Sequence, residues 1–191
     1  MGTIGFGFGC LDHLGCTFFA AGRVPIGCNH VILEGFPVTD TVPTLYEWCG
    51  GFAALRRLTD VFYERVLDDP LLEPIFRTMS PDHQDHVARW LGEVFHGPAD
   101  YTDHLGGYPA MLSHHIGLAI TEEQRARWAQ LIAESADEAG LPDDPEFRSA
   151  FVAYVEWGTR IAKANSQPGA NPPTDYPAPR WGWGEAPPYT P

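Results

Sequence analysis

The chain has 191 residues, which is enough for one domain with a sizeable hydrophobic core. Hydrophobic residues make up 44% of it, and the formal net charge is -13. Such a surface repels phosphate backbones and anionic lipid, so neither nucleic acid nor a membrane is expected as a partner. No apolar run approaches the roughly 18 residues of a membrane helix, and a cytoplasmic location is expected.

Residues 1–41 are rich in glycine and aromatic side chains and show little periodicity. We expect either a poorly ordered extension or a segment that an upstream start codon adds. The spacing of its thiols and imidazoles lacks the CxxC pair typical of zinc sites, so we interpret the thiols as incidental ones in a reduced compartment. These residues are Cys10, Cys16, Cys28, His13 and His30.

Residues 42–167 are expected to form an all-α domain. Thr44 and Glu47 have the spacing of a capping box, which predicts a short helix that a glycine pair then interrupts. A longer helix is expected from about Phe52 to Leu67. Its inner face carries Phe52, Leu55, Thr59, Phe62 and Val66, with Tyr63 on the edge of that face.

The sequence Ser80-Pro81-Asp82 predicts the N-cap and first turn of a helix over residues 81–95. The inner face of this helix has one polar residue at its head and is otherwise apolar. It reads His83, Val87, Trp90, Leu91 and Val94.

Two adjacent histidines, His114 and His115, follow Gly106-Gly107 on a predicted short helix. Thr121 and Gln124 form a second capping box, and the helix that they begin ends near Gly140. Asp144-Pro145 begins a last helix that ends near Asn165, with an apolar face made of Phe147, Phe151, Tyr154, Val155 and Ile161.

Residues 168–191 form a proline-rich tail that can be neither a helix nor a central strand. The run Pro179–Trp183 could bind a partner or fold back on the domain, but its composition favours a solvated tail.

The histidines allow one specific kind of site. Haem iron needs a neutral imidazole and a dry apolar pocket. Because consecutive residues of a helix point about 100° apart, only one of His114 and His115 can face an iron atom. His83 heads the apolar face of another helix and could lie opposite. Tyr63 and Trp128 could add hydroxyl and indole donors, although each of these residues could equally be an ordinary hydrogen-bonded core residue.

The block from Tyr46 to Asn165 resembles a truncated haemoglobin of group II. The matching segments keep the order and spacing of that family. They are Tyr46–Gly51, Val61–Tyr63, Leu72–Phe76, Trp90–Phe95, Gly107–Pro109, His115 and the run Ile120–Trp128.

This resemblance implies a two-over-two helical sandwich that holds haem b. It makes His115 the proximal ligand of the iron, Phe76 an aromatic that packs on the porphyrin, and Tyr63 and Trp128 donors on the distal side. His83 falls at the distal gate, with His86 as its competitor because the preceding loop is one residue shorter. The expected contacts with the cofactor are Phe76, Val87, Trp90, Met111, His114 and His115.

The sequence departs from the family at two places. His114 stands where arginine is common before the proximal histidine, so contacts with the propionates differ. His96-Gly97-Pro98 replaces the usual glycine pair after the distal helix, and the bend there is expected to change.

Three hypotheses follow. The first is a five-coordinate haem protein that binds oxygen, nitric oxide and carbon monoxide, and that oxidises nitric oxide or acts as a weak peroxidase with a separate reductase. The second is a six-coordinate haem protein for electron transfer or sensing, in which His83 or His86 binds the iron. The third is a helical interaction module without cofactor, whose proline-rich tail is the functional part.

Overall fold

The structure, a computed structural model, describes residues 41–184. The chain divides into two units, Met1–Thr39 and Asp40–Pro191, and the described residues belong to the second. The predictions for residues 1–40, including their cysteines and histidines, lie outside the described part. None of the helices from residue 41 to residue 184 is long and apolar enough to cross a bilayer.

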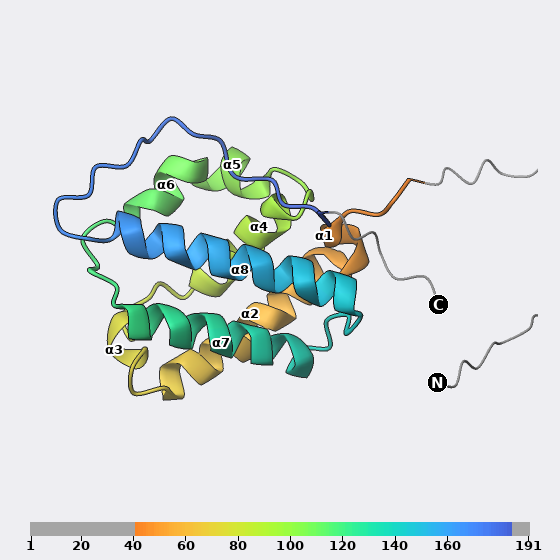
Figure 1. Ribbon diagram of the computed structural model, residues 1–191, viewed down its shortest axis with the longest axis horizontal. Helices are drawn as coiled ribbons and strands as arrows, with labels where there is room; N and C mark the ends of the chain where they lie inside the picture. Colours follow the sequence, from red (N-terminus) through yellow and green to blue (C-terminus); the bar gives the residue numbers. More distant parts are fainter. Residues whose placement is uncertain (1–40, 185–191) are drawn as a thin grey trace, which may run out of the picture. The chain divides into compact units, whose positions relative to one another are not determined.

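Every regular element between residues 41 and 184 is a helix, which confirms the all-α prediction (Figure 1). In chain order they are α1 (Leu45–Trp48), α2 (Gly51–Asp68), α3 (Glu73–Phe76), α4 (His83–Val94), α5 (Asp100–Leu105), α6 (Gly107–Ser113), α7 (Glu122–Glu138) and α8 (Pro145–Asn165).

The capping box before α1 is present as predicted. The Thr44 hydroxyl accepts the Glu47 N–H at 3.1 Å, and the Glu47 carboxylate accepts the Thr44 N–H at 2.8 Å. Gly50 then adopts a left-handed conformation with φ of 97°, which separates α1 from α2. On α2, Tyr63, which was expected on the edge of the inner face, is 1% exposed. It is buried because the neighbouring helices surround its ring.

The predicted beginning of α4 is wrong. We expected Ser80 to cap a helix that starts at Pro81, but α4 begins at His83. The Ser80 carbonyl accepts the His83 N–H at 2.9 Å, so a tight turn precedes the helix. Downstream, Trp90, Leu91 and Val94 are buried as predicted.

The second capping box, between Thr121 and Gln124, is confirmed at the beginning of α7. Asp144 caps α8 by accepting the Phe147 N–H at 2.8 Å. The apolar face of α8 is buried as predicted along its first part, at Phe147, Phe151, Tyr154 and Val155. Ile161 is 38% exposed, so its predicted inward position is wrong.

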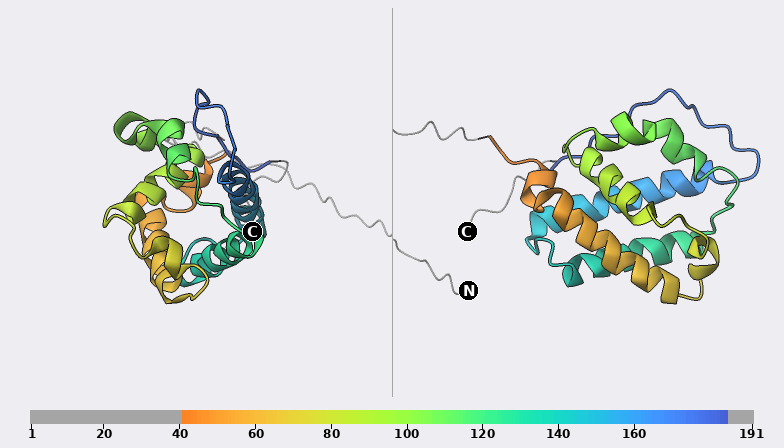
Figure 2. Two further views of the ribbon diagram at one scale, coloured as in Figure 1. Left: turned by 90° about the vertical axis from the view of Figure 1, so that its left-hand side faces the viewer. Right: turned by 180° about the vertical axis from the view of Figure 1, so that it is seen from behind.

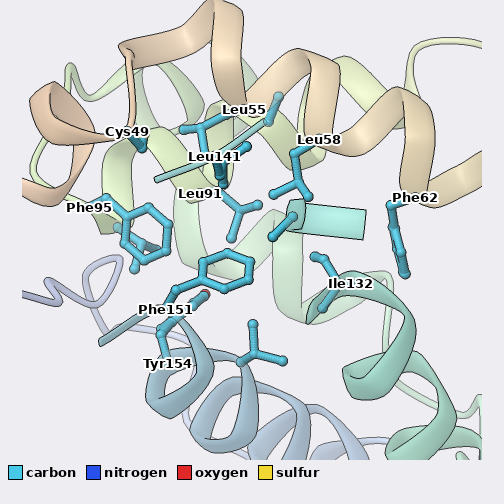
Figure 3. Packing of buried hydrophobic residues seen from close by; sticks show 14 of the residues in the cluster. Cys49, Leu55, Leu58, Phe62, Leu91, Phe95, Ile132, Leu141, Phe151 and Tyr154 are labelled. Atoms are coloured by element: carbon cyan, nitrogen blue, oxygen red, sulfur yellow. The ribbon is translucent and has the colours of Figure 1, made fainter. Parts of the chain in front are cut away.

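The helices form two layers around one core. α7 and α8 lie across α2 and α4, and the view from behind shows the same crossing (Figures 1 and 2). Side chains from all four helices meet between the layers, among them Leu55, Leu58, Leu91, Ile132 and Phe151 (Figure 3). Each fully buried side chain of this size stabilises the fold by about 1.5–3 kcal/mol.

Cys49 borders this core as a free, buried thiol. Its Sγ donates a hydrogen bond to the Tyr46 carbonyl oxygen, 3.3 Å away. Burial raises the pKa of the thiol to about 11, so the reactive thiolate is scarce at neutral pH.

The solvated tail that we preferred agrees with residues 168–177, most of which are exposed, but is wrong for residues 178–183, which fold back on the domain. The last carbonyls of a helix lack partners within the helix, and the tail supplies donors to those of α4. The Trp181 N–H reaches the Val94 oxygen at 2.8 Å, and the Arg180 guanidinium reaches the Glu93 oxygen at 2.8 Å. The Trp183 indole donates to the Pro43 oxygen at 2.7 Å. The tail therefore turns back from the end of α8, passes α6 and α5, and reaches α4 and α1 (Figure 1).

Candidate functional site

An aromatic cluster joins α2, α3 and α4. His83 Nε2 and the Tyr63 hydroxyl oxygen are 2.9 Å apart, so the two groups share a hydrogen bond. The Tyr63 ring centre lies 4.9 Å from that of His83 and 5.6 Å from that of Phe76. The structure thus brings together three predicted site residues from three separate segments.

Trp128 of α7 extends this cluster. Its ring centre lies 4.8 Å from that of Phe62, which lies 4.8 Å from that of Tyr63. The Trp128 side chain is only partly buried, and its indole N–H has no hydrogen-bond partner among residues 41–184. A donor without a partner, beside a cluster of aromatic rings, is available to a ligand.

His115 follows α6 directly, and a backbone hydrogen bond fixes its ring. His115 Nδ1 lies 2.9 Å from the Met111 carbonyl oxygen, so Nδ1 carries the proton and donates it. Nε2 then keeps its lone pair, and no group within the described residues takes it. Burial lowers the pKa of His115 and outweighs the opposing effect of the Met111 carbonyl. A neutral imidazole with a free, oriented Nε2 is the form that binds a metal ion.

The two histidine-bearing segments lie near each other. Burial, with a smaller effect of the positive charges of His114, His86 and His115, lowers the pKa of His83 to about 4. His83, rather than His86, is the histidine in contact with Tyr63. His114 is exposed, as expected for a residue at the rim of a slot.

The surroundings of these groups fit a flat apolar cofactor. Several apolar side chains on the same helices and loops pack against the core yet remain partly exposed; they are Phe76, Met79, Val87, Leu105, Met111 and Trp128. Ile116 and Leu118, which follow His115, are each 47% exposed. Porphyrin needs one imidazole on its iron and apolar contacts on its faces. The free Nε2 of His115 meets the first requirement, and the partly exposed apolar side chains meet the second.

The comparison with known families decides what this arrangement is. A family model described as "Bacterial-like globin" matches residues 44–156, more than half of the chain. The protein belongs to this globin family. The chain is also 33% identical over 110 residues to the group 2 truncated haemoglobin YjbI of Bacillus subtilis, an alignment that covers 58% of this chain and 81% of the relative.

Solved haemoglobin structures share the globin's architecture. One is the haemoglobin of Chloroflexus aurantiacus, at 32% identity with a TM-score of 0.56, covering 66% of this chain and 99% of that chain. Another is the truncated oxygen-avid haemoglobin of Bacillus subtilis, at 29% identity with a TM-score of 0.56, covering 63% and 98%. The predicted resemblance to group II truncated haemoglobins and the two-over-two fold are confirmed.

Other predicted residues of this globin lie as follows. Trp90 is 8% exposed, and its indole N–H donates to the Tyr154 hydroxyl at 2.7 Å, so one edge of the ring faces α8. Val87 and Met111 remain partly exposed on α4 and α6. At the second departure from the family, His96 adopts the left-handed conformation with φ of 69°. The contacts that these residues make with a cofactor stay predictions.

Two supports of the site had not been predicted from the sequence. Asp69 accepts the backbone N–H groups of Leu71 and Leu72, and Arg127 Nε contacts its other oxygen at 2.6 Å. This ion pair ties the turn before α3 to α7 beside Trp128. An Asp-Pro turn could have suggested the role of Asp69. No local signal points to Arg127, whose partner is distant in sequence.

Ser166 supports the segment that follows His115. Its backbone oxygen accepts the Ala119 N–H at 2.9 Å, and its hydroxyl oxygen accepts the Ile120 N–H at 3.0 Å. Ala119 has a φ of 51°, a strained conformation for a residue with a Cβ, so this anchor holds the loop in one shape. A hollow of about 380 Å³ lies elsewhere, between the α5–α6 junction and the tail, and contains none of the predicted site residues.

Proposed function

We propose that this globin holds haem b through His115 Nε2 and binds oxygen and other diatomic gases reversibly. The observation that carries the proposal is the hydrogen bond from His115 Nδ1 to the Met111 carbonyl, which leaves Nε2 free and oriented. Haem, when bound, supplies the iron that takes up the gas. The flanking residues Phe76, Val87, Trp90 and Met111 would provide apolar contacts, and the exposed His114 would lie near the propionates.

The distal residues would stabilise a bound gas that carries partial negative charge. The Tyr63 hydroxyl and His83 Nε2 share a hydrogen bond, and the Trp128 indole N–H has no partner among the described residues. Donors that are already in place act strongly in an apolar pocket because no solvent must reorganise around the charge. Their hydrogen bonds would slow release of the gas. The similar truncated haemoglobin of Bacillus subtilis is itself oxygen-avid.

Slow release favours chemistry on the bound gas over bulk oxygen delivery. We therefore propose oxidation of nitric oxide or a peroxidase-like reaction as the activity. Both need a source of electrons. A separate reductase is the proposed partner.

The test is haem retention by His115→Ala, with His104→Ala as the matched control because His104 is exposed at the end of α5. We expect His115→Ala to lose haem on gel filtration while the control keeps it. Full retention with unchanged visible spectra in His115→Ala would refute the ligand assignment.

The same spectra separate the remaining hypotheses. A high-spin ferrous spectrum with a clean shift on adding carbon monoxide would support five-coordinate iron. A low-spin ferrous spectrum that His83→Leu converts to high spin would instead show that His83 binds the iron. If the wild-type chain shows no haem band, the only one of the three hypotheses that still stands is the helical interaction module without cofactor.

A further inference from the structure

A chain of aromatic side chains crosses this globin from α4 to its surface. Trp90 donates its indole N–H to the hydroxyl of Tyr154 on α8 at 2.7 Å. The Tyr154 ring centre lies 6.2 Å from that of Trp157 and 5.8 Å from that of Trp181, and those two indoles lie 5.6 Å apart. Trp90 and Tyr154 are buried, whereas Trp157 is 41% exposed. The rings therefore form an unbroken path from inside the fold to solvent.

The inner end of this path, Trp90, lies on α4, the helix that begins with His83. Trp90 shares the inner face of α4 with His83 and Val87, and it is one of the proposed cofactor contacts. The family match covers residues 44–156, so Trp157 and the tail residue Trp181 both lie beyond it. Trp181 is fixed in place because its indole N–H donates to the Ala150 oxygen at 3.0 Å.

We infer that this globin, when peroxide oxidises its haem, draws electrons from Trp157 through Tyr154 and Trp90, so that bulky phenols are oxidised at the surface and not in the haem pocket. This inference rests on the proposed function. Electron tunnelling falls steeply with distance, and each step along the path joins rings or groups in contact.

The environment of each ring directs where the oxidised state comes to rest. A cation on Trp90 or Tyr154 would be buried in an apolar core, which is costly. Trp90 also cannot lose its proton readily, because its hydrogen bond ends on a weakly basic phenol oxygen. The Trp157 indole N–H has no partner within the described residues, and its exposed ring can release the proton to water. The radical therefore settles on Trp157.

The electrons and protons balance. One hydrogen peroxide accepts two electrons and two protons and leaves as two water molecules. Each electron comes from Trp157, which also releases its N–H proton to water. A phenol at the surface then gives one electron and one proton back to Trp157 and becomes a phenoxyl radical. Two phenols are oxidised for each peroxide, and the protein is unchanged.

The experiment locates the radical chemically. Ferric, haem-loaded protein is mixed with hydrogen peroxide and the spin trap 2-methyl-2-nitrosopropane, digested, and analysed by mass spectrometry. We expect the adduct on Trp157. A parallel assay measures peroxide-dependent oxidation of a phenol attached to dextran, which cannot enter a pocket. Trp157→Phe should lose both the adduct and this oxidation. The matched control is Tyr176→Phe, an exposed aromatic whose ring contacts that of Tyr108 and lies off the path.

The outcomes separate this inference from the proposed function. Loss of adduct and of dextran-phenol oxidation in Trp157→Phe, with both intact in Tyr176→Phe, supports the path. A wild-type protein that holds haem and reacts with peroxide, yet carries its adduct elsewhere, overturns the path alone. The same holds if Trp157→Phe oxidises the dextran phenol at the wild-type rate. A wild-type protein that retains no haem overturns the proposed function and the path together.

Discussion

Replacing Gly97 by alanine is expected to destabilise the fold at the corner between α1 and α4. A Cβ built on Gly97 would lie 2.7 Å from two ring carbons of Tyr46 and 2.8 Å from the Gly92 carbonyl oxygen. The carbonyl belongs to the backbone of α4 and cannot rotate away. The Tyr46 ring also packs closely over Gly92 of α4, since even a Cβ added there would lie only 3.2 Å from the ring, so the ring has little room to move toward α4. Both sides of the new methyl group are therefore closed.

Overpacking of this kind costs about 1–3 kcal/mol. The assay is urea unfolding of the haem-loaded protein, followed by circular dichroism. In a thermal scan the same loss would lower the midpoint by about 2–4 °C for each kcal/mol. The control is Gly182→Ala in the tail, where an added Cβ meets no atom within 4 Å. That control should change the free energy of unfolding by less than about 0.5 kcal/mol.

A Gly97→Ala protein as stable as the Gly182→Ala protein would refute the packing argument. A double mutant that combines Gly97→Ala with Tyr46→Ala would show how much of the cost comes from the ring, because residues in contact do not add independently.

Three further outcomes are expected. Trp128→Phe should speed oxygen dissociation by the loss of one hydrogen bond to a charged group, about 1.5–3 kcal/mol, and an unchanged off-rate would mean that the indole does not reach the ligand. Burial holds the pKa of His83 at about 4 in the folded state. As the pH falls, the unfolded chain therefore takes up the proton first, and the free energy of unfolding should decrease between about pH 6.5 and 4, by at most about 3 kcal/mol. In urea titrations, His83→Gln should show a weaker pH dependence of stability than the wild type. Asp69→Asn should weaken its contact with Arg127 and cost about 1–3 kcal/mol at pH 7, with the difference from wild type shrinking as the pH falls below about 4, and curves that stay parallel would argue against the ion pair.

Local signals in the sequence were sufficient for most of the helices, although the short helices α3 and α5 were not predicted. A capping box acts between residues three apart, and glycine or proline acts at its own position, so both can be recognised without the rest of the fold. The beginnings of α1, α7 and α8 were predicted correctly for this reason. The beginning of α4 was missed because its first turn depends on whether the Ser80 carbonyl bonds to a residue three or four positions ahead.

His115 could also be proposed as the iron ligand from the sequence, because the segments that resemble the family keep their order and spacing along the chain. What the sequence could not supply is the pairing across helices. Tyr63 meets His83, Arg127 meets Asp69, and Ser166 holds the loop after His115, each over a separation that no local pattern encodes.

The C-terminal tail shows most clearly which features depend on local sequence and which depend on tertiary packing. Its prolines correctly excluded helix and central strand, since that is a property of each residue's own backbone. Composition also suggested solvation, which holds for most of residues 168–177 but was wrong for residues 178–183. Donors at Arg180 and Trp181 meet the unpaired carbonyls at the end of α4, and those carbonyls become neighbours of the tail only when the helices have packed. The sequence alone thus determined most of the helices and pointed to a candidate iron ligand, whereas the tertiary structure decided which side chains meet across the helices and where the tail lies.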